Sequence, residues 1–288
     1  MYRNDFGAIR KRGEKMPSTY AHYRLGQKVR GLVSDEQKSI IESYPELFDI
    51  GLHGPDILFY YKPLKSNSVN RIGYQMHEKS GRKFFERAKK VILRKEEKEA
   101  YLAYIYGVLC HFALDVSCHS YIDQKINASG VSHAEIEVEF DRALMIRDGY
   151  FPITHKLTGH IVPSNQNAEV IREFYGDVTA KQVKKALKSM TFYNNLLIAP
   201  SRGKRKFVDA LLKVSGNYKE MHGLMVNYEE NPKCADSTKK LKELYDDAVV
   251  LATSLITEYP VCMHGDILEA VFRLLCVLEL CLVLTNLV

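Results

Sequence analysis

The feature that most constrains this chain is a polar stripe inside an apolar segment, LCHFALDVSCHSYI at residues 109–122. His111, Asp115 and His119 follow one another at intervals of four residues. Because each residue of an α-helix advances by about 100°, positions four apart drift by only about 40° and lie on one face. The surrounding residues are mostly apolar, which predicts a largely buried helix. An isolated carboxylate is costly to bury, so the stripe needs a partner.

A second polar pair follows in the sequence SHAEIE, where His133 and Glu137 are again four residues apart. Ser132 precedes the pair and is a suitable N-cap for a helix that begins there. The short turn region NASG, at 127–130, joins the two predicted helices. A connection of this length suits antiparallel neighbours whose polar stripes face each other.

Three more candidate ligands lie upstream. His22 is near the start of the first predicted helix, Asp56 follows Gly54 and Pro55 in a predicted loop, and His77 is on the third predicted helix. Imidazole and carboxylate donors without thiolate suit zinc, with manganese or iron as neighbours in preference. One such pair alone is usually structural, but three i,i+4 spacings within 27 residues favour a metal site. The candidate ligands are His22, Asp56, His77, His111, Asp115, His119, His133 and Glu137.

The apolar residues recur mostly at helical spacing, and strand-like alternation is scarce, so the chain is predicted to be all-α. Ser34 with Gln37, and Thr179 with Gln182, have the spacing of a capping box. A chain of 288 residues can form one large domain or two, and no boundary in the sequence requires two. The predicted helices lie near 18–30, 35–43, 72–93, 96–123, 131–148, 165–175, 179–198, 204–214, 236–258 and 264–286.

The composition bears on the binding partners of the protein, the state of its cysteines and its cellular location. The 41 Lys+Arg against 35 Asp+Glu give a net charge of +6, and short basic clusters occur at 10–15, 89–98 and 202–206. Such clusters fit an anionic ligand or surface but are usually solvated faces. The six cysteines have no CxxC spacing, which favours free thiols. The first 20 residues contain no hydrophobic segment, so we expect a cytoplasmic protein, with membrane-peripheral or unconventionally exported states as alternatives.

The C-terminal segment is unusually apolar. Residues 270–288 are apolar at 15 of 19 positions, interrupted by Arg273 and Glu279. Charges in the middle of a membrane span cost a few kcal/mol each, which favours a packed or self-associating helix over membrane contact. We therefore predict an N-terminal extension (1–15), a helical domain (16–260) and an apolar C-terminal helix of uncertain role (261–288).

The ordered set of candidate ligands resembles the bacterial zinc-dependent phospholipase C family. The resemblance rests on the strings MPSTYAHYRLG, GPDILFYY, YGVLCHFALDVSCH and HAEIE, which fit the family pattern in that order over residues 16–150. It implies an all-α, single-domain bundle of about ten helices, of the type shared by phospholipase C and P1 nuclease. It also implies a cleft with two to three zinc ions and hydrolysis of the phosphodiester between diacylglycerol and a headgroup.

The resemblance also assigns roles to individual residues. A first zinc would bind Asp56, His77, His111 and Asp115, a second would bind His119, His133 and Glu137, and a third would bind His22 with Asp115 bridging. Asp56 would be the catalytic general base that orients the attacking water. In the family the mature N-terminal amine completes the third site, whereas 21 residues precede His22 here. Ile57 replaces an aromatic residue that helps to bind choline.

These observations predict a zinc-dependent phosphodiesterase that acts on phospholipid headgroups or a related small ester, with possible contact to a membrane surface. One alternative is a nuclease or phosphomonoesterase that uses the same metal cluster. A second is a non-catalytic helical binding module whose fold is stabilised by zinc. No stable nucleic-acid partner is expected. Histidine-aspartate phosphohydrolases are disfavoured because they need an adjacent His-Asp pair, which the sequence does not contain.

Overall fold

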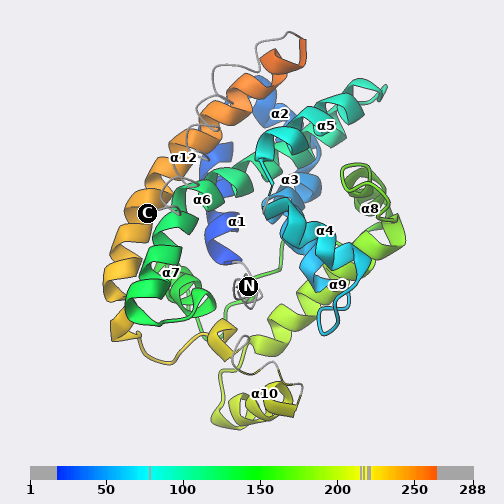
Figure 1. The fold of residues 1–288 in the computed structure, drawn as a ribbon. Coiled ribbons are helices and arrows are strands. Elements are labelled where there is room, and N and C mark those ends of the chain that lie inside the picture. Colours follow the sequence, from blue (N-terminus) through cyan, green and yellow to red (C-terminus); the bar gives the residue numbers. More distant parts are fainter. Residues whose placement is uncertain (1–17, 78, 215, 217, 219–221, 265–288) are drawn as a thin grey trace, which may run out of the picture.

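The protein is all-helical in a computed structural model that describes residues 18–264, except 78, 215, 217 and 219–221. No strand occurs among these residues, which confirms the predicted fold class. The helices surround α6 (Glu99–Ser129), which crosses the middle of the molecule (Figure 1). Two helices from opposite ends of the chain pack against it, α3 (Pro45–Gly51) and α12 (Ala235–His264).

The remaining elements complete the bundle in chain order. They are α1 (Tyr20–Arg30), α2 (Asp35–Ser43), the 3₁₀ helix η1 (Gly54–Tyr60), α4 (Ser68–His77), α5 (Gly81–Leu93), α7 (His133–Arg147), α8 (Asn165–Arg172), α9 (Ala180–Leu197), α10 (Arg202–Val214), η2 (His222–Leu224) and η3 (Pro232–Cys234). Most predicted helices are present with small differences at their ends. The capping boxes of α2 and α9 form as predicted, with Ser34 paired to Gln37 and Thr179 to Gln182.

Three predictions of local structure were wrong. The turn predicted at NASG (127–130) is helical up to Ser129, so α6 extends six residues beyond its predicted end at 123. The predicted helix 72–93 is interrupted between α4 and α5, where Gly81 begins a new helix against the ring of Phe112. A Cβ on Gly81 would lie 2.4 Å from that ring, so the close approach requires glycine. The predicted loop around 49–57 is mostly helical, because Pro45 and Pro55 each occupy a first-turn position that proline favours.

α6 is the helix on which the fold is built. Within the described residues it is the one helix long and apolar enough to cross a membrane, but 72% of its most apolar window is buried inside the protein. It is therefore a core helix that is apolar on most sides. α3 approaches it closely, because Gly51 and Gly107 face each other where the two helices cross. A Cβ on Gly107 would lie 2.2 Å from the carbonyl oxygen of Phe48.

The structure bears on only one end of the predicted domain, 16–260. α12 continues through Pro260 to His264, so the predicted boundary at 260 falls inside a helix. The predicted extension 1–15 and the residues of the predicted C-terminal helix beyond 264 lie outside the described residues. The four cysteines in the described part, Cys110, Cys118, Cys234 and Cys262, are buried free thiols.

Candidate metal centre

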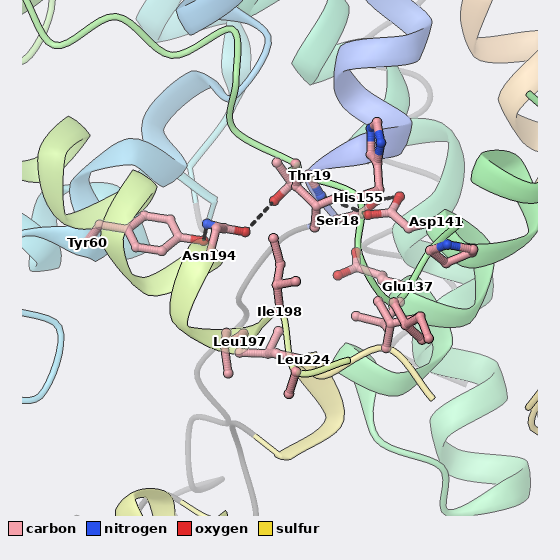
Figure 2. A pocket seen from close by; sticks show the side chains of 16 residues that line it. Ser18, Thr19, Tyr60, Glu137, Asp141, His155, Asn194, Leu197, Ile198 and Leu224 are labelled. Atoms are coloured by element: carbon pink, nitrogen blue, oxygen red, sulfur yellow. Dashed lines mark hydrogen bonds between the residues drawn. The ribbon is translucent and has the colours of Figure 1, made fainter. Parts of the chain in front are cut away.

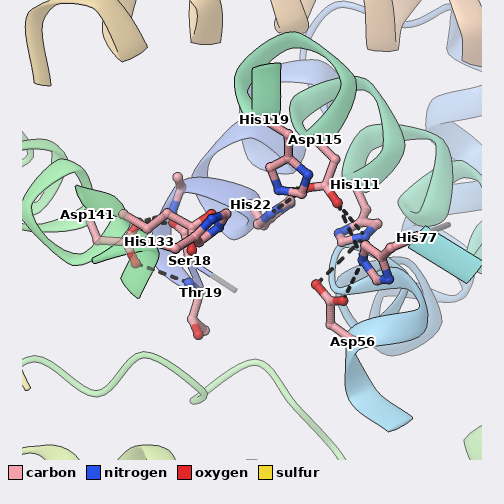
Figure 3. Close-up of polar contacts among 12 residues, drawn as sticks. Ser18, Thr19, His22, Asp56, His77, His111, Asp115, His119, His133 and Asp141 are labelled. Atoms are coloured by element: carbon pink, nitrogen blue, oxygen red, sulfur yellow. Dashed lines mark hydrogen bonds and ion pairs between the residues drawn. The ribbon is translucent and has the colours of Figure 1, made fainter. Parts of the chain in front are cut away.

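The stripe on α6 faces a cluster of histidines and carboxylates from four other elements (Figure 3). Asp115 lies in the middle of the stripe, with a side chain that is 15% exposed. Its Oδ2 atom is 3.3 Å from Nε2 of His111, and its Oδ1 atom is 3.7 Å from Nε2 of His119. The predicted arrangement of these three side chains on one helix face is present.

The first group of donors joins α6 to η1 and α4. Nε2 of His77 lies 2.9 Å from Oδ1 of Asp56, and Nε2 of His111 lies 3.8 Å from Oδ2 of the same carboxylate. Gly54 permits this approach, because a Cβ at that position would lie 2.3 Å from the His111 ring, and its φ of +47° disfavours other residues. The sequence GPD therefore places Asp56 directly against the central helix.

The second group adds α1. Nε2 of His22 lies 3.4 Å from Oδ1 of Asp115, and the ring of His22 stacks on that of His111 with centroids 4.7 Å apart. The start of α1 is held by Asp141 from α7. Its carboxylate accepts hydrogen bonds from the backbone N–H groups of Thr19, Tyr20 and Ala21 and from the hydroxyl of Ser18, as the dashed lines in Figure 3 show in part.

The third group joins the far end of the stripe to α7. Nε2 of His133 lies 3.0 Å from Oε1 of Glu137, and the rings of His119 and His133 have centroids 5.5 Å apart. Ser132 caps α7 by accepting a hydrogen bond from the N–H of Glu135, which fixes the first turn that carries His133. The two consecutive helices therefore present facing polar stripes, as their short connection predicted.

All eight predicted ligands lie in these groups, and the donor atoms of each group are within 4.8 Å of one another. The first two groups share His111, and Asp115 contacts histidines of all three. Five elements thus supply one continuous centre. The groups are Asp56, His77 and His111; His22, His111 and Asp115; and His119, His133 and Glu137.

The electrostatics of the centre follow from burial and from the mutual effects of these groups. Burial is the largest single influence on the pKa of His77 and would lower it, but the charges of Asp56 and Asp115 and the hydrogen bonds to Asp56 and Gly73 together outweigh burial and raise that pKa to about 9. Burial would raise the pKa of Asp115, but the adjacent histidines hold it well below its usual range. For His111 burial prevails and lowers the pKa. The centre therefore balances buried carboxylates with imidazoles.

The side chains present fit metal ions. Asp56, Asp115 and Glu137 form ion pairs only with histidines in the part of the chain that the structure describes. Oε2 of Glu137 is buried without a hydrogen-bond partner among these residues, which is unfavourable for a carboxylate unless a cation completes its coordination. Nitrogen and oxygen donors of this kind, without sulfur, suit zinc.

Three cavities adjoin the centre, and the smallest, of about 20 Å³, lies between His22, Asp115, His119 and Glu137. The other two differ in size and lining. The larger, of about 440 Å³, is lined by four of the candidate ligands and by an apolar wall that includes Met76, Phe84, Phe85 and Phe112. The smaller, of about 40 Å³, lies beside Glu137. Figure 2 shows its polar side, where Asn194 accepts a hydrogen bond from the hydroxyl of Thr19 and donates one to that of Tyr60. The larger cavity has the volume of a small-molecule site.

Sequence reasoning missed two groups next to the centre. His53 is 1% exposed, its ring centroid lies 6.5 Å from that of His22, and its Nε2 atom is 2.7 Å from Nε2 of His160. His53 was detectable because it lies three residues before Asp56 in the same segment, whereas His160 has no candidate ligand at helical spacing in the sequence. Asp141 had a clearer signal, because it follows Glu137 by four residues on the same helix.

Comparison with known proteins supports this description. The family model for zinc-dependent phospholipase C matches residues 21–189, which is more than half of the chain. No significant match to the chain is found among curated proteins or among solved structures. The matched range contains every candidate ligand, from His22 to Glu137. The chain therefore belongs to the zinc-dependent phospholipase C family.

Proposed function

We propose that the protein is a zinc-dependent phosphodiesterase that cleaves the headgroup ester of phospholipids. The observation that carries the proposal is the convergence of three donor groups on Asp115 and His111 beside a cavity of about 440 Å³. Membership of the family supports a phospholipase C-like hydrolase. The substrate headgroup and the number of metal ions are part of the proposal.

Zinc ions held by the three groups would supply positive charge that neutralises the phosphate and makes water more acidic. The protein contributes the placement of the reacting groups. Carboxylates from η1, α6 and α7 surround the centre and pair with its histidines. The apolar wall with Phe84, Phe85 and Phe112 fits the hydrophobic side of a phospholipid ester, while the histidines face the polar side.

Asp56 is proposed as the general base. Its side chain is 1% exposed and projects from a 3₁₀ turn that is fixed by Gly54 and Pro55. One carboxylate oxygen contacts His77, and the other is 3.8 Å from His111, so the group lies at the edge of the donor cluster rather than at its centre. A carboxylate in this position has the reach to hold a water molecule and accept its proton.

The test is elemental analysis combined with hydrolysis assays. We expect the purified protein to contain two to three zinc ions, and His111→Ala and His133→Ala to lose at least one each, because they interrupt different groups. His155→Ala is the matched control, since His155 belongs to none of the three groups. Unchanged zinc content in both ligand variants would contradict the metal assignment.

The catalytic part of the proposal has a separate measurement. Asp56→Asn is expected to keep most of its zinc and to lose about 10²–10⁴-fold in turnover, the usual contribution of a general base. The substrates to compare are phospholipid vesicles, a soluble phosphocholine ester and single-stranded DNA. Preferential cleavage of DNA would favour the nuclease alternative, and zinc-loaded protein without phosphoester hydrolysis would favour a non-catalytic module.

A further inference from the structure

The outer face of α10 carries an exposed apolar stripe. Phe207, Leu211 and Val214 are 60%, 43% and 88% exposed, and their spacing of four and three residues places them on one side of the helix. Val208 and Leu212 are buried on the other side and attach the helix to the protein. α10 therefore has two apolar faces, and packing within the described residues uses only one of them.

Basic residues border this stripe. Lys206 and Lys213 lie about 100–120° around the helix axis from Phe207 on one side. Lys204 lies about 60° from it on the other side, where its ammonium donates to the carbonyl oxygen of Asn195. Long basic side chains at the edges of an apolar stripe are typical of helices that lie in the interface of a bilayer. Their stems cover apolar surface while their charges reach the lipid phosphates.

The preceding helix extends the same pattern. Lys181, Lys185, Lys188 and Phe192 follow one face of α9, and Phe192 is 61% exposed. Residues 180–214 contain nine of the 41 Lys+Arg and one of the 35 Asp+Glu. The rest of the chain, with 32 basic and 34 acidic residues, is slightly acidic. The positive charge of the protein is thus concentrated on α9 and α10.

This basic pair of helices is next to the candidate metal centre. α10 projects from one end of the molecule and is joined to α9 by a short connection (Figure 1). Leu197, at the end of α9, and Ile198 and Ala199, which follow it, line the cavity of about 40 Å³ beside Glu137. The guanidinium of Arg205 donates to the carbonyl oxygen of Val226, which lines the same cavity. A surface bound by α10 would therefore lie close to the centre.

We propose that α10 docks the protein on anionic phospholipid bilayers, with Phe207, Leu211 and Val214 inserted between headgroups and the lysines of α9 and α10 on the lipid phosphates. Charge complementarity selects this occupant. A second copy of the chain would bring two strongly basic surfaces together, which repels. The proposal concerns membrane binding alone and does not depend on the proposed hydrolysis. Membrane binding would bring the metal centre close to phospholipid.

The test is cosedimentation of the full-length protein with vesicles of phosphatidylcholine, with and without 30% phosphatidylserine. We expect binding to the anionic vesicles that weakens with added salt. Lys206→Gln with Lys213→Gln is expected to weaken it by about fivefold per lysine. Phe207→Ala with Leu211→Ala is expected to weaken it at least tenfold, because the inserted apolar area is lost.

Matched controls lie on α12, away from the basic pair. Val250→Ala removes an apolar side chain that is 68% exposed, and Lys239→Gln with Lys242→Gln removes two exposed lysines. These variants should bind vesicles as the parent does. Equal binding to neutral vesicles, or equal losses in the control variants, would overturn the proposal. So would a change from dimer to monomer in Phe207→Ala with Leu211→Ala, because the stripe would then be an interface between copies.

Failure of docking and failure of hydrolysis are separable. The docking variants should hydrolyse a soluble phosphocholine ester at the parental rate and lose rate only on vesicles, since α10 contributes none of the eight candidate ligands. If the chain has no hydrolase activity, the sedimentation result still decides the proposal. If docking fails, turnover of the soluble ester is unaffected.

Discussion

The crossing of α3 and α6 gives a sharp test of how the fold positions the centre, through Gly107→Ala. A Cβ at Gly107 would lie 2.2 Å from the carbonyl oxygen of Phe48 and 2.8 Å from Cα of Gly51. Carbon atoms of real side chains essentially never approach other atoms closer than 3.0 Å. Because both obstacles are backbone atoms, no side chain can move aside, and the two helices must separate by about 1 Å.

The magnitude follows from two opposing effects. Overpacking of this kind costs about 1–3 kcal/mol, and the rigid backbone contact places Gly107→Ala near the upper limit. Replacing glycine by alanine inside a helix returns about 1 kcal/mol. We therefore expect a loss of about 2 kcal/mol in the free energy of unfolding, which corresponds to a decrease in Tm of roughly 4–8 °C for a chain of this size.

We expect a loss of activity that the loss of stability alone would not cause. α3 leads directly into η1, so a shift of α3 moves Asp56 relative to His111. A displacement of about 1 Å in a reacting group costs up to about 10²-fold in rate. We expect kcat/KM of Gly107→Ala to fall about 10–100-fold at a temperature where the variant is fully folded.

The assays are thermal unfolding by circular dichroism, zinc content and hydrolysis of a soluble phosphodiester. Gly203→Ala is the control, because a Cβ there meets no atom within 4 Å and the residue lies in the first turn of α10. It should leave activity unchanged and raise stability slightly. If Gly107→Ala were as stable as the parent, or unstable but fully active, the close crossing would not be what positions Asp56.

Two further predictions concern groups beside the candidate ligands. Burial lowers the pKa of His160 from 6.5 to about 4, so its contribution to stability is complete above pH 6.5 and is lost as pH falls toward 4. In urea unfolding, the free energy of unfolding of the parent should fall between pH 7 and pH 5, and His160→Gln should fall by about 2 kcal/mol less. Parallel pH profiles of the two proteins would contradict this. Asp141→Ala leaves three backbone N–H groups at the start of α1 without their acceptor and should cost at least about 3 kcal/mol. It should also reduce zinc content by up to one ion through His22, whereas retention of all zinc would show that Asp141 has only a structural role.

The parts of the centre that sequence predicted best are those that depend on a single helix. His111, Asp115 and His119 are positioned by the 3.6-residue repeat of α6, and His133 and Glu137 by that of α7. The helical period alone places these side chains on common faces. The connection between α6 and α7, residues 130–132, is shorter than the sequence predicted, and it brings the two faces together.

The other ligands depend on contacts that no local pattern contains. His22 and Asp56 reach the centre because Asp141 holds the start of α1 and because Gly51 meets Gly107 at the helix crossing. The resemblance to a family supplied the order of these residues but not the contacts that bring them together. The pairing of His53 with His160 joins residues 107 positions apart, a separation that no helical period contains.

The basic cluster at 202–206 shows why periodicity alone can mislead. From the sequence it was interpreted as a solvated face, because charged residues on an amphipathic helix usually point to water. Yet apolar residues occur on two sides of α10, and the period does not say which of them the protein covers. The structure buries Val208 and Leu212 and leaves Phe207 and Leu211 outside. An apolar stripe that remains exposed beside lysines is unfavourable in water alone. An anionic membrane can accommodate both features, because its apolar interior takes up the stripe and its phosphates pair with the lysines.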